Sequence, residues 1–75
     1  MDIHTGLTAV FEQQGNNYIA YIEEIPGVNT QGATLSEARA NLVEALELLL
    51  EVRREMAKEE QVGRMITKEE IKMVA

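Results

Sequence analysis

One uninterrupted segment, from Ile25 to Glu51, carries signals for a tight turn, a short strand, a helix cap and a long amphipathic helix. Its first four residues, I-P-G-V, suit a type II β-turn, because proline presets φ at the second position and glycine accepts the positive φ of the third. Val28 to Gln31 then leaves room for only a short strand, from which Gly32 releases the chain. The segment therefore predicts a strand that leads directly into a helix.

The helix that follows has a defined start, a core-facing stripe and a stop. Thr34 and Glu37 form a T-x-x-E capping box, whose side chains satisfy amide donors that a new helix leaves unpaired, so we expect the helix to begin near Leu35. Gly63 is predicted to stop it. At 100° per residue, one stripe forms the predicted core face and contains Leu35, Ala38, Leu42, Ala45, Leu46, Leu49 and Met56.

The same projection predicts where the helix leaves the core. Arg53 falls near the centre of the stripe, so we expect the helix to have passed the edge of the sheet there and Arg53 to snorkel to solvent. Core packing should weaken after about Val52. Farther along, Glu55 and Lys58 are spaced for an i,i+3 ion pair.

Val43 and Leu48 lie outside the stripe, on opposite flanks of the predicted helix. A small sheet can cover only one side of a single helix, and these apolar residues lie beyond that side. We therefore favour the interpretation that another chain covers this surface. The alternative is that flanking apolar residues such as leucine simply favour helix formation.

Two strands are predicted ahead of this segment. From Ile3 to Phe11, apolar residues favour alternate positions, as in a half-buried strand. Gln13 to Asn16 is polar and contains glycine, as a four-residue hairpin loop would, and Tyr18 to Glu24 resumes with β-formers. The two strands should therefore be antiparallel neighbours.

The pairing register of these two strands is predicted by requiring that their large apolar side chains lie on one face of the sheet. The expected pairs are Phe11 with Tyr18, Ala9 with Ala20, and Leu7 with Ile22. The opposite face then carries a mixed set of side chains, namely Thr8, Val10, Ile19, Tyr21 and Glu23.

The chain has 75 residues, which suits a single domain over residues 1–75. Folding at this size buries only about 60% of the unfolded surface, so we expect a partner or oligomerisation to supplement the core. Cysteine is absent, which excludes disulfides and thiol chemistry. The start lacks the features of a secretory signal and no stretch approaches the ~20 apolar residues of a membrane span, so a cytoplasmic location without membrane contact is expected.

The formal net charge of −6 argues against a nucleic-acid binder, because affinity for phosphate backbones comes chiefly from clustered lysine and arginine. An acidic chain suits a basic protein partner better. A net negative charge can also serve only to keep a protein soluble, so the charge leaves both a basic partner and simple solubility open as explanations.

No catalytic, metal or cofactor site is predicted. A metal-dependent nuclease needs several convergent carboxylates, but the only aspartate, Asp2, lies at a terminus, and Glu23 and Glu24 alternate across the sheet. The single histidine, His4, has no second histidine with which to bind zinc. Ser36 lies just after the predicted helix start with no nearby base, as expected of a first-turn helix residue rather than a nucleophile.

Several short motifs follow one another in order: Y-I-A-Y at 18–21, E-I-P-G at 24–27, T-Q-G-A-T-L-S-E-A at 30–38 and N-L-V-E-A at 41–45. This order resembles the single-domain HicB-like antitoxins of bacteria and archaea, and the resemblance covers roughly Leu7 to Glu51. It implies a two-layer α+β fold, β-β-β-α-β, in which one long helix packs on an antiparallel sheet as a partial RNase H-like motif. Residues 65–75 alone suit either a capped helix or a strand, and the resemblance favours the strand.

The resemblance also implies a function. A HicB-like antitoxin binds and neutralises a small basic HicA-like toxin, which is an mRNA-cleaving ribonuclease. We expect the toxin to contact Tyr21, Glu23 and Glu24, since acidic side chains can mask a surface built to attract RNA phosphates. A terminal strand could add to a neighbouring protomer's sheet, so we also expect a homo-oligomer, with interface candidates Val43, Leu48, Ile71 and Met73.

The chain departs from two-domain HicB antitoxins, which carry a C-terminal DNA-binding domain. Only about a dozen residues follow Gly63, so neither a separate DNA-binding domain nor direct nucleic-acid binding is expected. The rival hypothesis is an orphan HicB-like module without a toxin, acting as an oligomeric scaffold or regulatory adaptor.

Overall fold

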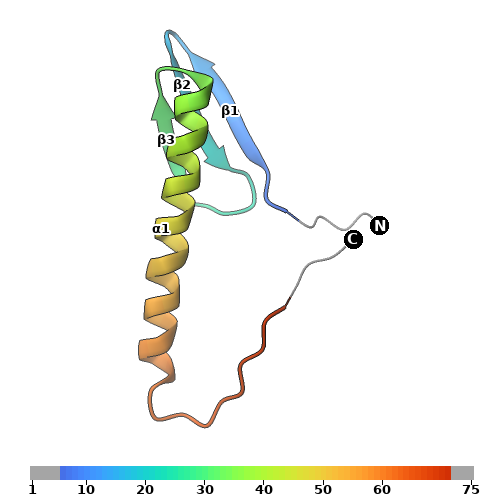
Figure 1. The fold of residues 1–75 in the computed structure, drawn as a ribbon, viewed down its shortest axis with the longest axis vertical. Helices are drawn as coiled ribbons and strands as arrows, with labels where there is room; N and C mark the ends of the chain where they lie inside the picture. Colours follow the sequence, from blue (N-terminus) through green and yellow to red (C-terminus); the bar gives the residue numbers. More distant parts are fainter. Residues whose placement is uncertain (1–5, 72–75) are drawn as a thin grey trace, which may run out of the picture.

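The computed structural model describes residues 6–71 and contains three strands followed by one helix. The elements are β1 (Ala9–Gln14), β2 (Asn17–Ile22), β3 (Asn29–Gly32) and α1 (Leu35–Gln61). The strands form one antiparallel sheet in the order β1-β2-β3, and α1 packs across one face of it (Figure 1). The predicted α+β class, with an antiparallel sheet and one long helix, is confirmed.

The β1–β2 hairpin is tighter than predicted, which shifts its register. Gln14 pairs with Asn17, so the loop has two central residues instead of four. Gly15 has φ 61°, and Asn16 is not among the positive-φ residues, as in a type II′ turn with glycine at its first central position. Phe11 consequently faces Ala20 rather than Tyr18.

The shift also changes the other expected pairs. Ala9 faces Ile22, and Leu7 precedes the strand. The displacement is two residues, and because side chains alternate with a period of two, each strand residue keeps the sheet face that was predicted for it.

The β2–β3 connection folds back through the predicted turn. Gly27 has φ 92°, which is the positive value that the third position of a type II turn requires. The Ile22 amide donates to the Val28 carbonyl at 3.3 Å, and Val28 is 2% exposed. The turn therefore closes against the core.

The helix begins at the predicted cap. Thr34 is extended at φ −129°, and its hydroxyl accepts a hydrogen bond from the Glu37 amide at 3.1 Å. The helix ends at Gln61, and Gly63, at φ 79°, follows it in the left-handed conformation common after helix ends. Both ends agree with the sequence prediction.

A small core lies between the sheet and the first half of α1. Its buried members are Ala20, Ile22, Val28, Ala38 and Leu42, and partly buried residues pack around them. Gly32 permits the close approach, because a Cβ there would lie 2.5 Å from the Ala38 backbone nitrogen. The Asn41 side chain donates to the Gln31 carbonyl at 2.9 Å, which ties α1 to the short edge strand β3.

The fourth strand is not present among the described residues. Residues 64–71 have no regular secondary structure, so Ile71 is not in a strand, and Met73 lies outside the described residues. The segment leaves the far end of α1, well away from the sheet (Figure 1), and so has no strand edge beside it. The described residues therefore give β-β-β-α, and the RNase H-like arrangement implied by the resemblance is not confirmed.

Candidate protein-binding surfaces

The sheet face opposite α1 has an apolar centre. Val10 pairs with Tyr21 and Glu12 pairs with Ile19, so these side chains adjoin on the face that α1 does not cover. Val10, Ile19 and Tyr21 are half-buried within the chain, while Glu12 is exposed. The polar side chains of β3 that share this face are Asn29 and Gln31. The arrangement is an apolar patch with a polar rim, as is common in protein interfaces.

Of the two acidic side chains at the end of this sheet, one has a structural role. The Glu24 carboxylate accepts hydrogen bonds from the Thr8 amide at 2.7 Å and from the Thr8 hydroxyl at 2.6 Å. The Glu23 amide donates to the Thr8 carbonyl at 3.0 Å, and the Glu23 side chain is exposed. Of the three predicted contact residues, Tyr21 lies on the open sheet face, Glu23 is exposed beyond the end of β2, and Glu24 holds the start of β1. The sequence prediction missed this last role because the two partners are 16 residues apart.

The predicted interface residues that the structure describes, which exclude Met73, do not form one patch. Val43 and Leu48 are 53% and 61% exposed, and they lie on different flanks of α1. Ile71 is exposed in the segment after the helix. The structure therefore presents these residues as separate exposed positions.

A further apolar surface lies where α1 extends past the sheet (Figure 1). A shallow hollow there is lined by Leu49, Val52, Arg53, Met56, Ala57 and Glu60, and we call these residues the overhang patch. The patch continues the core stripe, and its exposure agrees with the prediction that core packing weakens after about Val52. Sequence reasoning identified the end of the core but not the continuous surface beyond it.

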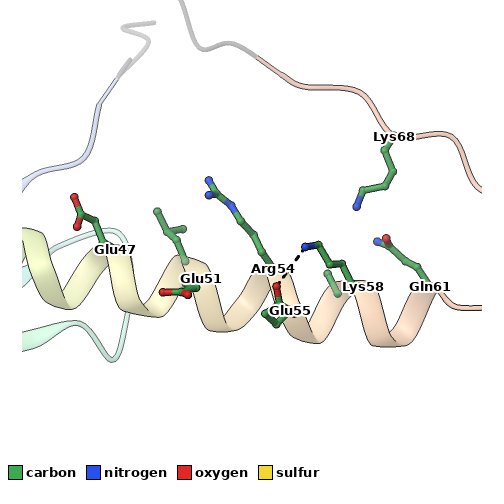
Figure 2. A pocket seen from close by; sticks show the side chains of 9 residues that line it. Glu47, Glu51, Arg54, Glu55, Lys58, Gln61 and Lys68 are labelled. Atoms are coloured by element: carbon green, nitrogen blue, oxygen red, sulfur yellow. Dashed lines mark hydrogen bonds and ion pairs between the residues drawn. The ribbon is translucent and has the colours of Figure 1, made fainter.

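The neighbouring side of the overhang is charged. Figure 2 shows Glu47, Glu51, Arg54, Glu55 and Lys58 along the helix, with Lys68 pointing back toward α1 from the segment after it. Lys58 and Glu55 form the predicted ion pair at 3.3 Å. The hollow between the helix and the returning segment is lined by three acidic and three basic side chains, so it has no strong charge of one sign.

The described residues contain no group of three or more histidine, cysteine, aspartate or glutamate side chains placed to hold a metal ion. No polar or charged side chain is buried in residues 6–71. Asp2 and His4 lie outside the described residues. Within that same range, α1 is not apolar enough along its length to cross a membrane.

A family model described as UPF0150-like matches residues 7–58. The chain is similar to a UPF0150 protein of Thermotoga maritima, with 42% identity over 41 residues that cover 55% of each chain. It is also similar to the UPF0150 protein ssl0738 of Synechocystis sp., with 46% identity over 50 residues, or 65% of this chain and 69% of the relative. This chain thus spans about half the length of the first relative. No solved structure matches it.

Proposed function

The chain belongs to the UPF0150-like family, and from that premise we propose that it is the antitoxin of a type II toxin–antitoxin system. In this proposal it binds and neutralises a small basic HicA-like mRNA-cleaving toxin in the cytoplasm. The support comes from the ordered motifs between Tyr18 and Ala45, which resemble those of HicB-like antitoxins. The chain itself performs no catalysis in this role.

The observation that carries the proposal is the open sheet face. Val10, Ile19 and Tyr21 form an apolar centre that α1 does not cover. Glu12 adjoins it and Glu23 follows the end of β2, in a chain with a net charge of −6. A basic protein partner would match this surface in both respects: its apolar side chains would exclude water at the centre, and its cations would meet the acidic rim.

The adjacent reading frame provides the test. We expect a short, strongly basic, histidine-containing protein to be encoded there and to copurify with this chain. Ile19→Arg should abolish copurification, because it would place an unpaired charge in the centre of the patch. The variant also needs a folded circular dichroism spectrum, and Ala40→Arg, at an exposed position of α1 away from this sheet face, is its control. Copurification that survives Ile19→Arg would refute the proposed surface.

Glu23 tests the electrostatic part separately. Glu23→Lys should slow association with the basic protein and reduce the salt dependence of its rate, because rim charges act mainly on encounter. Glu44→Lys, on the exposed side of α1, makes the same change in net charge and is the matched control. Glu24 is less suitable for reversal because its carboxylate binds Thr8.

The second candidate is an orphan HicB-like module that serves as an oligomeric scaffold or regulatory adaptor. It is favoured by the exposed apolar side chains of α1, which include Val43, Leu48, Val52 and Met56. The absence of a basic neighbour in the genome would favour this role. In both roles we propose homo-oligomers and no direct contact with nucleic acid.

A further inference from the structure

We propose that two copies of this chain associate through the overhang patch, with their α1 helices antiparallel and Arg53 of each copy opposite Glu60 of the other. The proposal concerns self-association alone and does not depend on a toxin. It also uses a different surface from the flank residues Val43 and Leu48.

The overhang patch is a direct continuation of the helix face that forms the core. Leu42 is 3% exposed under the sheet, whereas Val52 and Met56, farther along the same face, are 49% and 55% exposed. Leu49 lies at the transition and is only partly buried. The same apolar stripe is thus covered by the sheet over its first half and uncovered over its second, and an apolar partner surface would complete it.

The two charges in the patch determine the orientation of the partner. Arg53 and Glu60 are seven residues apart on this face, so they lie nearly in line along the helix axis. In a parallel pair each charge would meet its own copy, which is repulsive. In an antiparallel pair centred between Met56 and Ala57, each Arg53 meets a Glu60, and the dimer gains two ion pairs at the ends of an apolar centre.

The antiparallel arrangement also separates the two sheets. Each sheet covers the first half of its own helix, at the end away from the overhang (Figure 1). With the helices paired about Met56 and Ala57, each sheet lies beyond the other copy's helix end and does not obstruct contact. Val52 then faces the last turn of the opposite helix, which ends at Gln61.

The chain's own following segment does not occupy the patch. Lys68 lines the charged hollow together with Glu47 and Arg54 (Figure 2). At 100° per residue, Val52 and Met56 of the overhang patch lie on a different side of α1. Among the described residues, therefore, the segment after the helix leaves the apolar stripe uncovered. A second copy supplies both an apolar stripe and the complementary charges.

Charge-swapped variants test the proposal by analytical ultracentrifugation at low salt. The native chain should dimerise at micromolar concentration. Arg53→Glu and Glu60→Arg should each raise the dimer Kd at least about tenfold, because two attractive pairs become repulsive. An equimolar mixture of the two variants should form heterodimers, since positions 53 and 60 are both acidic in the first variant and both basic in the second. The double variant Arg53→Glu/Glu60→Arg should regain native affinity.

Arg54→Glu is the matched control, because Arg54 lies on the charged side of the same helix turn. It makes the same change in net charge as Arg53→Glu and should leave the dimer intact. Circular dichroism should show native helix content in all variants, since the altered side chains are exposed. A monomeric native chain would overturn the proposal. Single variants with native dimer affinity would also overturn it, as would a mixture of the two variants that dimerises no more strongly than either variant alone. Equal losses of dimer affinity from Arg53→Glu and Arg54→Glu would do the same.

Discussion

Replacing Gly32 with alanine tests how closely α1 approaches the sheet. An ideal Cβ at this position lies 2.5 Å from the Ala38 nitrogen, 2.9 Å from the Ala38 Cα and 3.0 Å from the Glu37 carbonyl carbon. Favourable contacts between such atoms require about 3.5–4.0 Å, so the start of α1 must move by roughly an ångström. The obstructing atoms belong to the backbone and cannot move away by changing a side-chain rotamer.

The expected cost combines overpacking with partial loss of nearby hydrogen bonds. Overpacking a fitted interior typically costs about 1–3 kcal/mol. Moving the first helical turn also strains the 3.1 Å bond from the Glu37 amide to Thr34, in a type of cap worth about 1 kcal/mol when lost completely. Alanine recovers about 0.4–1 kcal/mol by restricting the unfolded chain. The net loss should be about 2 kcal/mol, which lowers the Tm of a domain of this size by roughly 10 °C.

Urea and thermal unfolding followed by circular dichroism would measure this loss. Protein concentration must be the same for both variants, because association stabilises the folded state. Gly6→Ala is the matched control, since a Cβ at Gly6 meets no atom within 4 Å and its φ is not positive. Gly6→Ala should be neutral or slightly stabilising. If Gly32→Ala were as stable as Gly6→Ala, the close approach of α1 to β3 would be refuted.

Two further predictions concern the core and the acidic end of the sheet. Leu42, a side chain 3% exposed, is in the core, so Leu42→Ala should lower the free energy of unfolding by about 2–5 kcal/mol. Leu48 is 61% exposed, so Leu48→Ala should change that free energy by less than about 0.5 kcal/mol. Equal effects of the two variants in urea unfolding would contradict the assigned core. Glu24→Gln should weaken the hydrogen bonds to Thr8 at 2.7 and 2.6 Å and lower the free energy of unfolding by about 1 kcal/mol. It should also speed exchange of the Thr8 amide hydrogen. Glu23→Gln, the control, should leave that exchange unchanged. Unaltered exchange in Glu24→Gln would show that the carboxylate does not hold this strand.

Local signals in the sequence predicted the helix well. The T-x-x-E spacing and the 100° stripe depend only on neighbours along the chain, and the helix begins at Leu35 with the Thr34 cap formed. The hairpin register was wrong because a polar stretch with glycine suits either a two-residue or a four-residue loop. Tyr21 was still placed on the correct face, because a shift of two residues preserves alternation.

Features that depend on distant contacts could not be predicted in this way. Gly32 was interpreted as the residue that releases the chain from β3, yet its main constraint is the backbone of Ala38, which the fold brings beside it. Glu24 was assigned to a partner because an acidic residue at a strand end gives no sign of its bonds to Thr8. The fourth strand expected by resemblance lies largely outside the described residues, and residues 64–71 follow the far end of α1 without regular secondary structure.

The length of α1 also couples folding to assembly. Isolated helices shorter than about 12–15 residues are only marginally stable in water, and the turns after Val52 receive no support from the sheet. In a lone chain these turns would unwind and reform far more readily than the turns around Leu42. Any partner that covers them would therefore lengthen the stable helix, and slower amide exchange in the last turns would report binding even without a change elsewhere in the fold.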